Sequence, residues 1–187
     1  MTDIKKENIE MLDVLDENGV FTGILRARAE VHEKGLWHRA AILAIVNSDN
    51  KILMQHRSDN VRKFPGKWDL STACHVLNGE DSLSSIVRET NEEIGVQIGF
   101  RAEVRDFRYV TSFRNHLTVG DIIENQFYDL FMLRRDIDSL SDLRFNDAEV
   151  SEIQFMTYSE IMYLLQNGQL HPRTEWLEPI NKVIYRF

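Results

Sequence analysis

Three glutamates lie within five positions of one another in the stretch Arg88-Glu-Thr-Asn-Glu-Glu-Ile-Gly-Val96. On a helix, Glu89, Glu92 and Glu93 would share one face, because residues three and four apart are neighbours there. Like charges at this spacing repel, and the helix dipole disfavours acids near a C-terminus, which Gly95 marks. A bound divalent cation would reverse both penalties, and Mg²⁺ prefers carboxylate oxygens and substrate phosphates. The stretch therefore predicts a metal site for phosphate chemistry, although most glutamate runs are solvated helix faces.

The helix that would carry these acids has recognisable ends. Asp81 or Ser82 can cap its start, and Gly95 suits the left-handed position that ends a helix. The 3.6-residue period predicts that its apolar stripe consists of Leu83, Val87, Thr90 and Ile94.

Strand-like runs surround this helix. Two hairpins are expected before it, one with its turn at Asn18-Gly19 and one joining residues 40–46 to 52–55. Residues 58–75 show no periodicity and predict a loop of the kind that often carries function. Strands are predicted at 107–113, 122–133 and 150–156, and helices at 159–168 and 175–187. This order indicates an α+β fold in which helices flank a mixed sheet.

Composition narrows the function classes. The 187 residues are 43% hydrophobic and 28% charged, which suits one globular domain spanning 1–187. The formal net charge of −8 disfavours binding to long nucleic acid. No apolar run reaches the length of a signal peptide or a membrane span, so a cytoplasmic protein that does not enter membranes is expected. The single cysteine, Cys74, excludes an intramolecular disulfide and a cysteine cluster for zinc.

Residues 74–96 resemble the signature of the Nudix hydrolases. That signature is a glycine, five residues, Glu, seven residues, and then Arg-Glu-apolar-x-Glu-Glu-x-Gly-apolar. The spacing matches throughout, but Cys74 stands at the first glycine and Thr90 at the aliphatic position. The resemblance implies the Nudix fold, an α/β/α sandwich with a mixed sheet and a catalytic loop-helix-loop at 74–96. It also implies cleavage of a diphosphate linkage with Mg²⁺ or Mn²⁺ as cofactor.

The resemblance assigns roles to individual residues. Arg88 would pair with an acid to orient the helix, and Glu80 would support the loop or the metal shell, beside the catalytic Glu89, Glu92 and Glu93. The implied metal ligands are Glu89, Glu92, Glu93, Glu124 and the backbone carbonyl of Cys74. A cysteine keeps that carbonyl but does not favour positive φ. Its side chain is expected to be a small buried hydrophobe rather than a catalytic thiol.

Substrate contacts are expected from Arg57, Trp68 and His75. The Arg57 guanidinium could grip a diphosphate with bidentate hydrogen bonds. Trp68 could stack on a base, although large aromatics mostly fill cores. An ordinary solvated loop explains Arg62 and Lys63 nearly as well as phosphate binding does. Glu149 matches a late acid with which some Nudix relatives activate water.

The similarity continues outside the signature, over about residues 8–160. The stretches DENG, EVHEKGLWHRA, ILMQHRS, FPGKWDLSTACH and IIENQFYDLF resemble type I isopentenyl-diphosphate isomerases and their hydrolase relatives. Those isomerases use a cysteine and a glutamate beside a metal held by three histidines and two glutamates. His75 and Glu124 match that set, but the cysteine falls at Ala73 and the acid/base glutamate at Gln126. Neither replacement transfers a proton near neutral pH, which favours hydrolysis.

Two further histidines lie upstream. His32 and His38 are six residues apart, where the isomerase pair is seven apart. They are expected to be surface or hydrogen-bonded histidines, and less often metal ligands.

The leading interpretation is a hydrolase of nucleoside diphosphates linked to another moiety, or of similar organic diphosphates. Residues 1–35 would form a β-hairpin extension and residues 158–187 a C-terminal helical segment, either of which could serve a homodimer. An isomerase-like enzyme and a non-catalytic nucleotide sensor remain alternatives. The expected partner is a small-molecule diphosphate.

Overall fold

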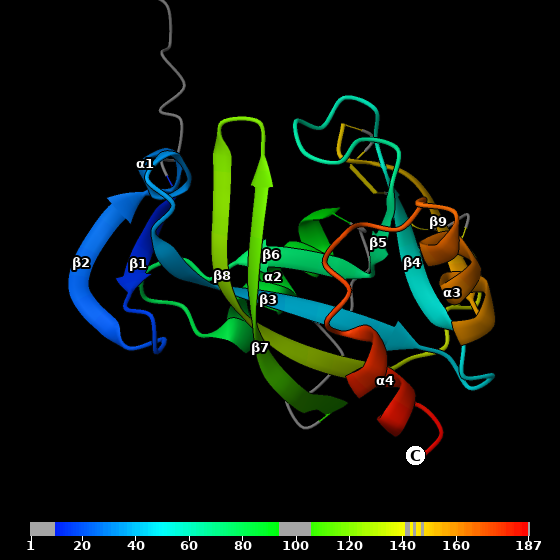
Figure 1. Cartoon of the computed structure of the whole chain (residues 1–187). Coiled ribbons are helices and arrows are strands. Elements are labelled where there is room, and N and C mark those ends of the chain that lie inside the picture. Colours follow the sequence, from blue (N-terminus) through cyan, green and yellow to red (C-terminus); the bar gives the residue numbers. More distant parts are fainter. Residues whose placement is uncertain (1–9, 94–105, 141–142, 144, 147, 187) are drawn as a thin grey trace, which may run out of the picture.

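The computed structural model describes residues 10–93, 106–140, 143, 145, 146 and 148–186. Its architecture is α+β, with nine strands in one mixed sheet and helices around it, as the sequence predicted (Figure 1). In chain order the elements are β1 (Met11–Leu15), β2 (Phe21–Ala27), α1 (Arg28–Glu33), β3 (Trp37–Val46), β4 (Ile52–Arg57), β5 (Trp68–Leu70), β6 (Thr72–His75), α2 (Ser82–Glu93), β7 (Phe107–Val119), β8 (Ile122–Arg134), β9 (Val150–Met156), α3 (Tyr158–Gln166) and α4 (Leu177–Val183).

Strand β3 organises the sheet. It runs parallel to β8 along its whole length, from the pair Trp37 and Asn125 to the pair Val46 and Arg134. Strand β3 also pairs antiparallel with β6, and β8 forms a long antiparallel hairpin with the preceding strand β7. A second group forms around β4, which pairs with β5 and β9. The sheet is therefore mixed, and its centre is buried.

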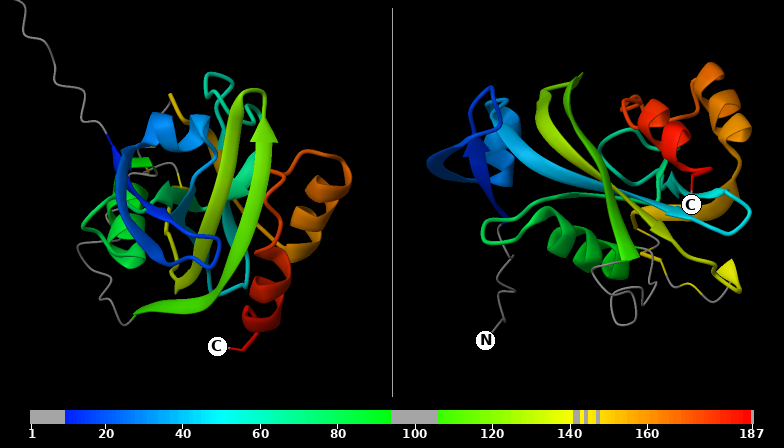
Figure 2. Two further views of the ribbon diagram at one scale, coloured as in Figure 1. Left: turned by 60° about the vertical axis from the view of Figure 1, so that its left-hand side comes forward. Right: turned by 90° about the horizontal axis from the view of Figure 1, so that it is seen from below.

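Alternate residues of β3 face opposite sides of the sheet, because successive side chains of a strand point in opposite directions. Ala40, Ile42 and Ala44 belong to one buried cluster with side chains of α3 and α4. Ala41 and Leu43 belong to another, which includes Ile86 of α2. Figure 2 shows α2 on one side of the sheet and α3 with α4 on the other. This arrangement is the expected α/β/α sandwich.

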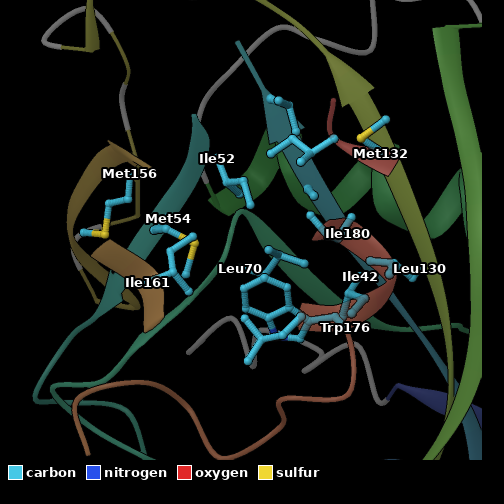
Figure 3. Close-up of a cluster of buried hydrophobic side chains, with 14 of the residues drawn as sticks. Ile42, Ile52, Met54, Leu70, Leu130, Met132, Met156, Ile161, Trp176 and Ile180 are labelled. Carbon is cyan, nitrogen blue, oxygen red and sulfur yellow. The ribbon is translucent and has the colours of Figure 1, made fainter. Parts of the chain in front are cut away.

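The larger cluster fixes the C-terminal helices to the sheet. Trp176 and Ile180 are completely buried beside Ile42 and Leu70 (Figure 3). Met54 and Met156 extend this apolar layer under α3 (Figure 3). Burial of such a continuous layer is the dominant stabilising contribution in a domain of this size.

The predicted N-terminal hairpin is confirmed. Strands β1 and β2 pair antiparallel around a turn in which Gly19 has φ +82°, and α1 follows directly (Figure 1). Gly35, with φ +59°, ends this segment, and a Cβ there would lie 2.9 Å from the Ile123 side chain. A glycine is therefore needed where α1 approaches β8.

Two predictions about local structure are wrong in part. The second hairpin keeps its turn, but β3 and β4 pair only at Val46 and Ile52, because each strand finds longer partners elsewhere. The expected loop at 58–75 holds two short strands, β5 and β6, which pair with β4 and β3. Their short length hides their period in the sequence. The described helices include none long and apolar enough to cross a membrane.

Candidate active site

A cavity of about 460 Å³ opens between α2, β6, β8 and the loop before β5. Acidic and basic side chains both line it. The acids are Glu10, Asp69, Glu89, Glu93, Glu124 and Glu149, and the bases are Arg28, Arg57, Arg62, Lys63, Arg88 and Arg173. A cavity with convergent charged groups of both signs suits a polyanion that is bound together with a cation.

The helix that carries the glutamates starts as the sequence predicted. The Ser84 backbone N–H donates to Asp81 Oδ1 over 2.7 Å, so Asp81 caps the helix. The expected apolar stripe is wrong in part, because α2 buries Ser85, Ile86 and Thr90 against the sheet and only Thr90 belongs to the predicted stripe. The Thr90 hydroxyl donates to Thr72 Oγ1 over 3.1 Å, and this bond satisfies a polar group in the core. Ile94 and the predicted helix end at Gly95 lie outside the described residues.

This rotation of the helix separates the three acids. Glu89 and Glu93 line the cavity. The side chain of Glu92 is 62% exposed, lies 3.4 Å from Arg88 Nη1, and is not among the described residues that line the cavity. The geometry therefore distinguishes an inner pair of carboxylates from one that faces solvent.

Glu93 has the most perturbed environment of the inner pair. Burial raises its pKa well above the usual value, and the charges of Glu89 and Glu149 raise it further. Its Oε2 is buried and has no hydrogen-bond partner among the described residues. Burial also raises the pKa of Glu89, although Arg88 opposes the effect. A buried, unpaired carboxylate beside like charges is costly unless a cation neutralises it.

Arg88 pairs with Glu80, whereas the sequence predicted an acidic partner for Arg88 without identifying it. The Arg88 Nε and Nη2 atoms each donate to a carboxylate oxygen of Glu80 over 3.1 Å, and Nη1 donates to Glu89 Oε2 over 2.6 Å. The Ser85 hydroxyl donates to Glu80 over 2.6 Å. These bonds hold the pKa of the Glu80 carboxyl below its usual value. The guanidinium thus ties the preceding loop to the helix and orients Glu89.

Replacing Arg88 with lysine tests this positioning role. Lysine keeps the charge but cannot donate to Glu80 and Glu89 at once. Supporting contacts of this kind change metal affinity or activity by about 10- to 100-fold, so a loss of kcat in that range is expected. Mg²⁺ affinity, measured by calorimetry, should fall in parallel with kcat. An unchanged Mg²⁺ affinity would contradict the positioning role.

Cys74 lies within β6, paired with Ala41 of β3, and its side chain is 7% exposed. Burial raises the thiol pKa well above its usual value, and the nearby glutamates add to this. A strand position needs no positive φ, so cysteine replaces glycine here without backbone strain. The expected small buried hydrophobe fits this placement better than a reactive thiol does.

The expected substrate contacts divide into two groups. Arg57 and His75 line the cavity. The Arg57 Nε and Nη2 atoms donate to the Lys63 carbonyl over 3.1 and 2.9 Å, which fixes the loop before β5. The Trp68 ring lies 5.0 Å from the His56 ring and packs against the core, and it is not among the described cavity-lining residues.

Three histidines that are distant in sequence come together beside the cavity. Ligating nitrogens of His32, His38 and His75 lie within 4.8 Å of one another. His32 and His38 are buried, which the sequence did not predict. Burial lowers the pKa of both imidazoles to about 4, so they are neutral at physiological pH. Glu124 does not join this cluster but forms an ion pair with Lys63.

A second polar cluster in the cavity wall was not predicted from the sequence. Arg173 Nη2 donates to Asp69 over 2.6 Å, and both side chains are almost completely buried. Burial lowers the pKa of the adjacent His171 to about 4. The available signal was the segment His171-Pro-Arg173, because polar residues around a proline in a loop often carry function.

Comparison with known proteins places these features in a family. The model of the NUDIX domain matches residues 36–177. A Nudix hydrolase of Listeria monocytogenes is 31% identical over 88% of this chain and 89% of its own length. Nudix hydrolase 3 of Arabidopsis thaliana is 34% identical over 81% of the chain, which spans only 20% of that protein.

Isomerases and a solved structure are also similar. An isopentenyl-diphosphate Delta-isomerase of Streptomyces avermitilis is 29% identical over 76% of this chain and 74% of its own length. A crystal structure of a Deinococcus radiodurans protein superposes with a TM-score of 0.67 at 22% identity, covering 95% of this chain and 98% of that one. The fold of that protein and the fold described above are the same.

Proposed function

Because the chain belongs to the Nudix hydrolase family, we propose that it hydrolyses the diphosphate linkage of a small organic diphosphate, such as a nucleoside diphosphate linked to another moiety. The observation that carries the proposal is the cavity-facing pair Glu89 and Glu93, where Glu93 Oε2 has no partner among the described residues and lies near the charge of Glu149. Carboxylates in this arrangement need a divalent cation to neutralise them. A cation held by carboxylates usually also binds the phosphates of a substrate, and a diphosphate supplies them.

The donor set fits Mg²⁺ or Mn²⁺. Glu89 and Glu93 would hold the ion as inner ligands, with Glu92 and the Cys74 carbonyl as further candidates from the family pattern. When bound, the ion lowers the pKa of a coordinated water and stabilises charge on the displaced phosphate. Glu149 lies in the same cavity and could accept the proton of the attacking water.

The basic residues of the cavity support diphosphate binding. Arg28 and Arg57 line the cavity together with the acids, so they can offset phosphate charge that a metal leaves uncompensated. Arg88 stays engaged with Glu80 and therefore acts on the helix rather than on the substrate. The chain thus supplies binding and orientation, and needs no protein nucleophile.

Isomerisation is the competing activity within this subgroup. Ala73 lines the cavity at the position of the isomerase cysteine, and it has no proton to transfer. At the position of the acid/base glutamate, the Gln126 amide accepts from the Tyr128 hydroxyl over 2.5 Å and lies 3.0 Å from His38 Nε2. An amide held in this way does not titrate near neutral pH, so hydrolysis is the better-supported reaction.

A screen of purified protein tests the proposal. Nucleoside diphosphate sugars, dinucleoside polyphosphates and isopentenyl diphosphate would each be supplied with Mg²⁺, and phosphate-containing products and double-bond migration would be followed. Metal-dependent cleavage of at least one diphosphate is expected, and Glu89→Gln should abolish it. Double-bond migration without cleavage would establish the isomerase instead. Tight binding without turnover of any compound would establish the nucleotide sensor.

Location and assembly stay predictions. We propose a cytoplasmic protein, in keeping with its net charge of −8 and its small-molecule substrate. A homodimer through the N-terminal hairpin or the last helix would appear as a doubled mass in light scattering.

A further inference from the structure

Lys63 reaches into the cavity wall from the loop before β5. Its ammonium forms an ion pair with Glu124 of β8, and the two side chains are only 18% and 7% exposed. The loop is built to hold it there, because the Arg57 guanidinium binds the Lys63 carbonyl through two hydrogen bonds. The next residue, Phe64, adopts φ +49°, which is uncommon for a residue with a large side chain. Fixing the long, flexible Lys63 side chain in one conformation costs side-chain entropy.

The Glu124 carboxylate is therefore paired with Lys63 and is not free to bind a metal ion. The ion pair with Lys63 outweighs burial and holds the pKa of the Glu124 carboxyl below its usual value. The carboxylate that could have joined His32, His38 and His75 as a ligand instead binds a cation that the chain itself provides.

The lone pairs of two of the imidazoles, His38 and His75, are also occupied. His38 Nδ1 lies 3.0 Å from the Leu36 carbonyl, which can only accept, so Nδ1 carries the proton and Nε2 is the acceptor. The Gln126 Nε2 atom lies 3.0 Å from that Nε2 and 3.3 Å from His75 Nε2. An amide nitrogen only donates, so both imidazoles accept from Gln126.

Hydrogen bonding at its carbonyl oxygen fixes the orientation of the Gln126 amide. Its Oε1 accepts from the Tyr128 hydroxyl over 2.5 Å, and that hydroxyl accepts from Arg173 Nη1 over 3.1 Å. Turning the amide would break these bonds in a buried site. The His32 Nε2 atom lies 3.1 Å from His75 Nε2. All three nitrogens that converge in the cluster are engaged in hydrogen bonds.

We propose that Lys63 is a tethered cation that replaces a metal ion at the histidine cluster, and that the Gln126 amide closes this cluster to divalent metals. The three-histidine, two-glutamate metal site of the isomerases does not fit the residues found here. One glutamate has become an amide that donates to the ligand nitrogens, and the other is neutralised by Lys63. The only divalent metal site of the cavity among the described residues is then that of the α2 acids. This inference does not depend on the proposed hydrolytic activity.

Zinc binding tests the proposal. Imidazole ¹⁵N resonances of the three histidines would be recorded while Zn²⁺ is added to the wild type and to Lys63→Met/Gln126→Glu. In the wild type these resonances should not move. In the double variant they should shift, and equilibrium dialysis should find about one additional Zn²⁺ per chain, because a free carboxylate pair and three imidazoles suit zinc. The extra ion should be lost again when His38→Ala is added.

The matched control is Arg62→Met, which removes one positive charge from the same loop at an exposed ion pair with Asp121. This variant should behave as the wild type does. If this double variant does not fold, Lys63→Gln/Gln126→Glu, which keeps a polar side chain at position 63, carries the test in its place, and Zn²⁺ should raise its melting temperature but not that of the wild type. Zinc-induced shifts of the wild-type imidazoles would overturn the proposal. So would a folded Lys63→Met/Gln126→Glu variant that takes up no additional zinc.

Discussion

Replacing Glu93 by glutamine is expected to lower kcat by on the order of 10³-fold and, at the same time, to raise the melting temperature of the metal-free protein. The loss of activity follows from the loss of a metal ligand, since metal-assisted charge stabilisation contributes several kcal/mol and each 1.36 kcal/mol is tenfold in rate. The gain in stability follows because Glu93 is buried beside Glu89 and Glu149, and a neutral isostere removes that repulsion. Steady-state kinetics with Mg²⁺ and calorimetry in chelator measure the two effects.

The pH dependence of the stability gain has a definite sign. The folded pKa of Glu93 is raised above the ordinary value of 4.5, so the folded protein binds more protons than the unfolded chain between these two values. Wild-type stability is therefore lost as the pH rises through this window, and the advantage of Glu93→Gln should widen above about pH 4.5. A constant difference between pH 4 and pH 8 would show that Glu93 does not carry the perturbed charge.

Glu92→Gln is the matched control, because it makes the same chemical change one residue from Glu93 and three residues from Glu89. Its side chain is mostly exposed, and its bond to Arg88 is a long one of 3.4 Å. A much smaller loss of kcat than in Glu93→Gln is expected, with no change in metal-free stability. Equal losses in the two variants would mean that Glu92 turns inward when the metal binds.

The local part of the site was predictable from the sequence. The acids, Arg88 and Glu80 lie within 14 positions of one another, and a helix with an Asp81 cap converts that spacing into geometry. The rotation of the helix was not predictable from hydrophobicity alone. Ser85 is buried because Glu80 satisfies its hydroxyl, and such a partner is visible only in the folded chain.

The distant part of the site depends on contacts that no local pattern encodes. Lys63 meets Glu124 across 61 positions, and Asp69 meets Arg173 across 104. The pairing of β4 with β5 and of β3 with β8 places Lys63 near Glu124, and an isolated bridge between Trp68 and Leu170 places Arg173 near Asp69. Strand lengths and periodicity predicted most of these strands, but which strands would be neighbours followed only from the structure. The residues missed by the sequence, Asp69 and Arg173, are therefore ones whose role is defined by a long-range partner.

The ion pair between Asp69 and Arg173 should be the most sensitive point of the fold. Arg173→Met is expected to lower the free energy of unfolding by about 3 to 5 kcal/mol, because it leaves a buried carboxylate without its cation. The two side chains are 2% and 4% exposed, and Arg173 also supports the Tyr128 hydroxyl. Urea denaturation measures the loss from the shift of the midpoint at constant slope.

The double variant Asp69→Leu/Arg173→Met separates the charge effect from the packing effect. Removing both charges leaves no uncompensated ion, so it should recover most of the stability lost in Arg173→Met. Lys182→Met breaks a pair of similar length, 2.6 Å to Glu178, on the exposed face of α4 and should leave the urea midpoint unchanged. The folded pKa of Asp69 lies below the ordinary 3.8, so the wild-type advantage should persist above that pH and disappear only as the pH falls through the folded value. A wild-type advantage lost at neutral pH would place the stabilising charge elsewhere, because Asp69 remains ionised there.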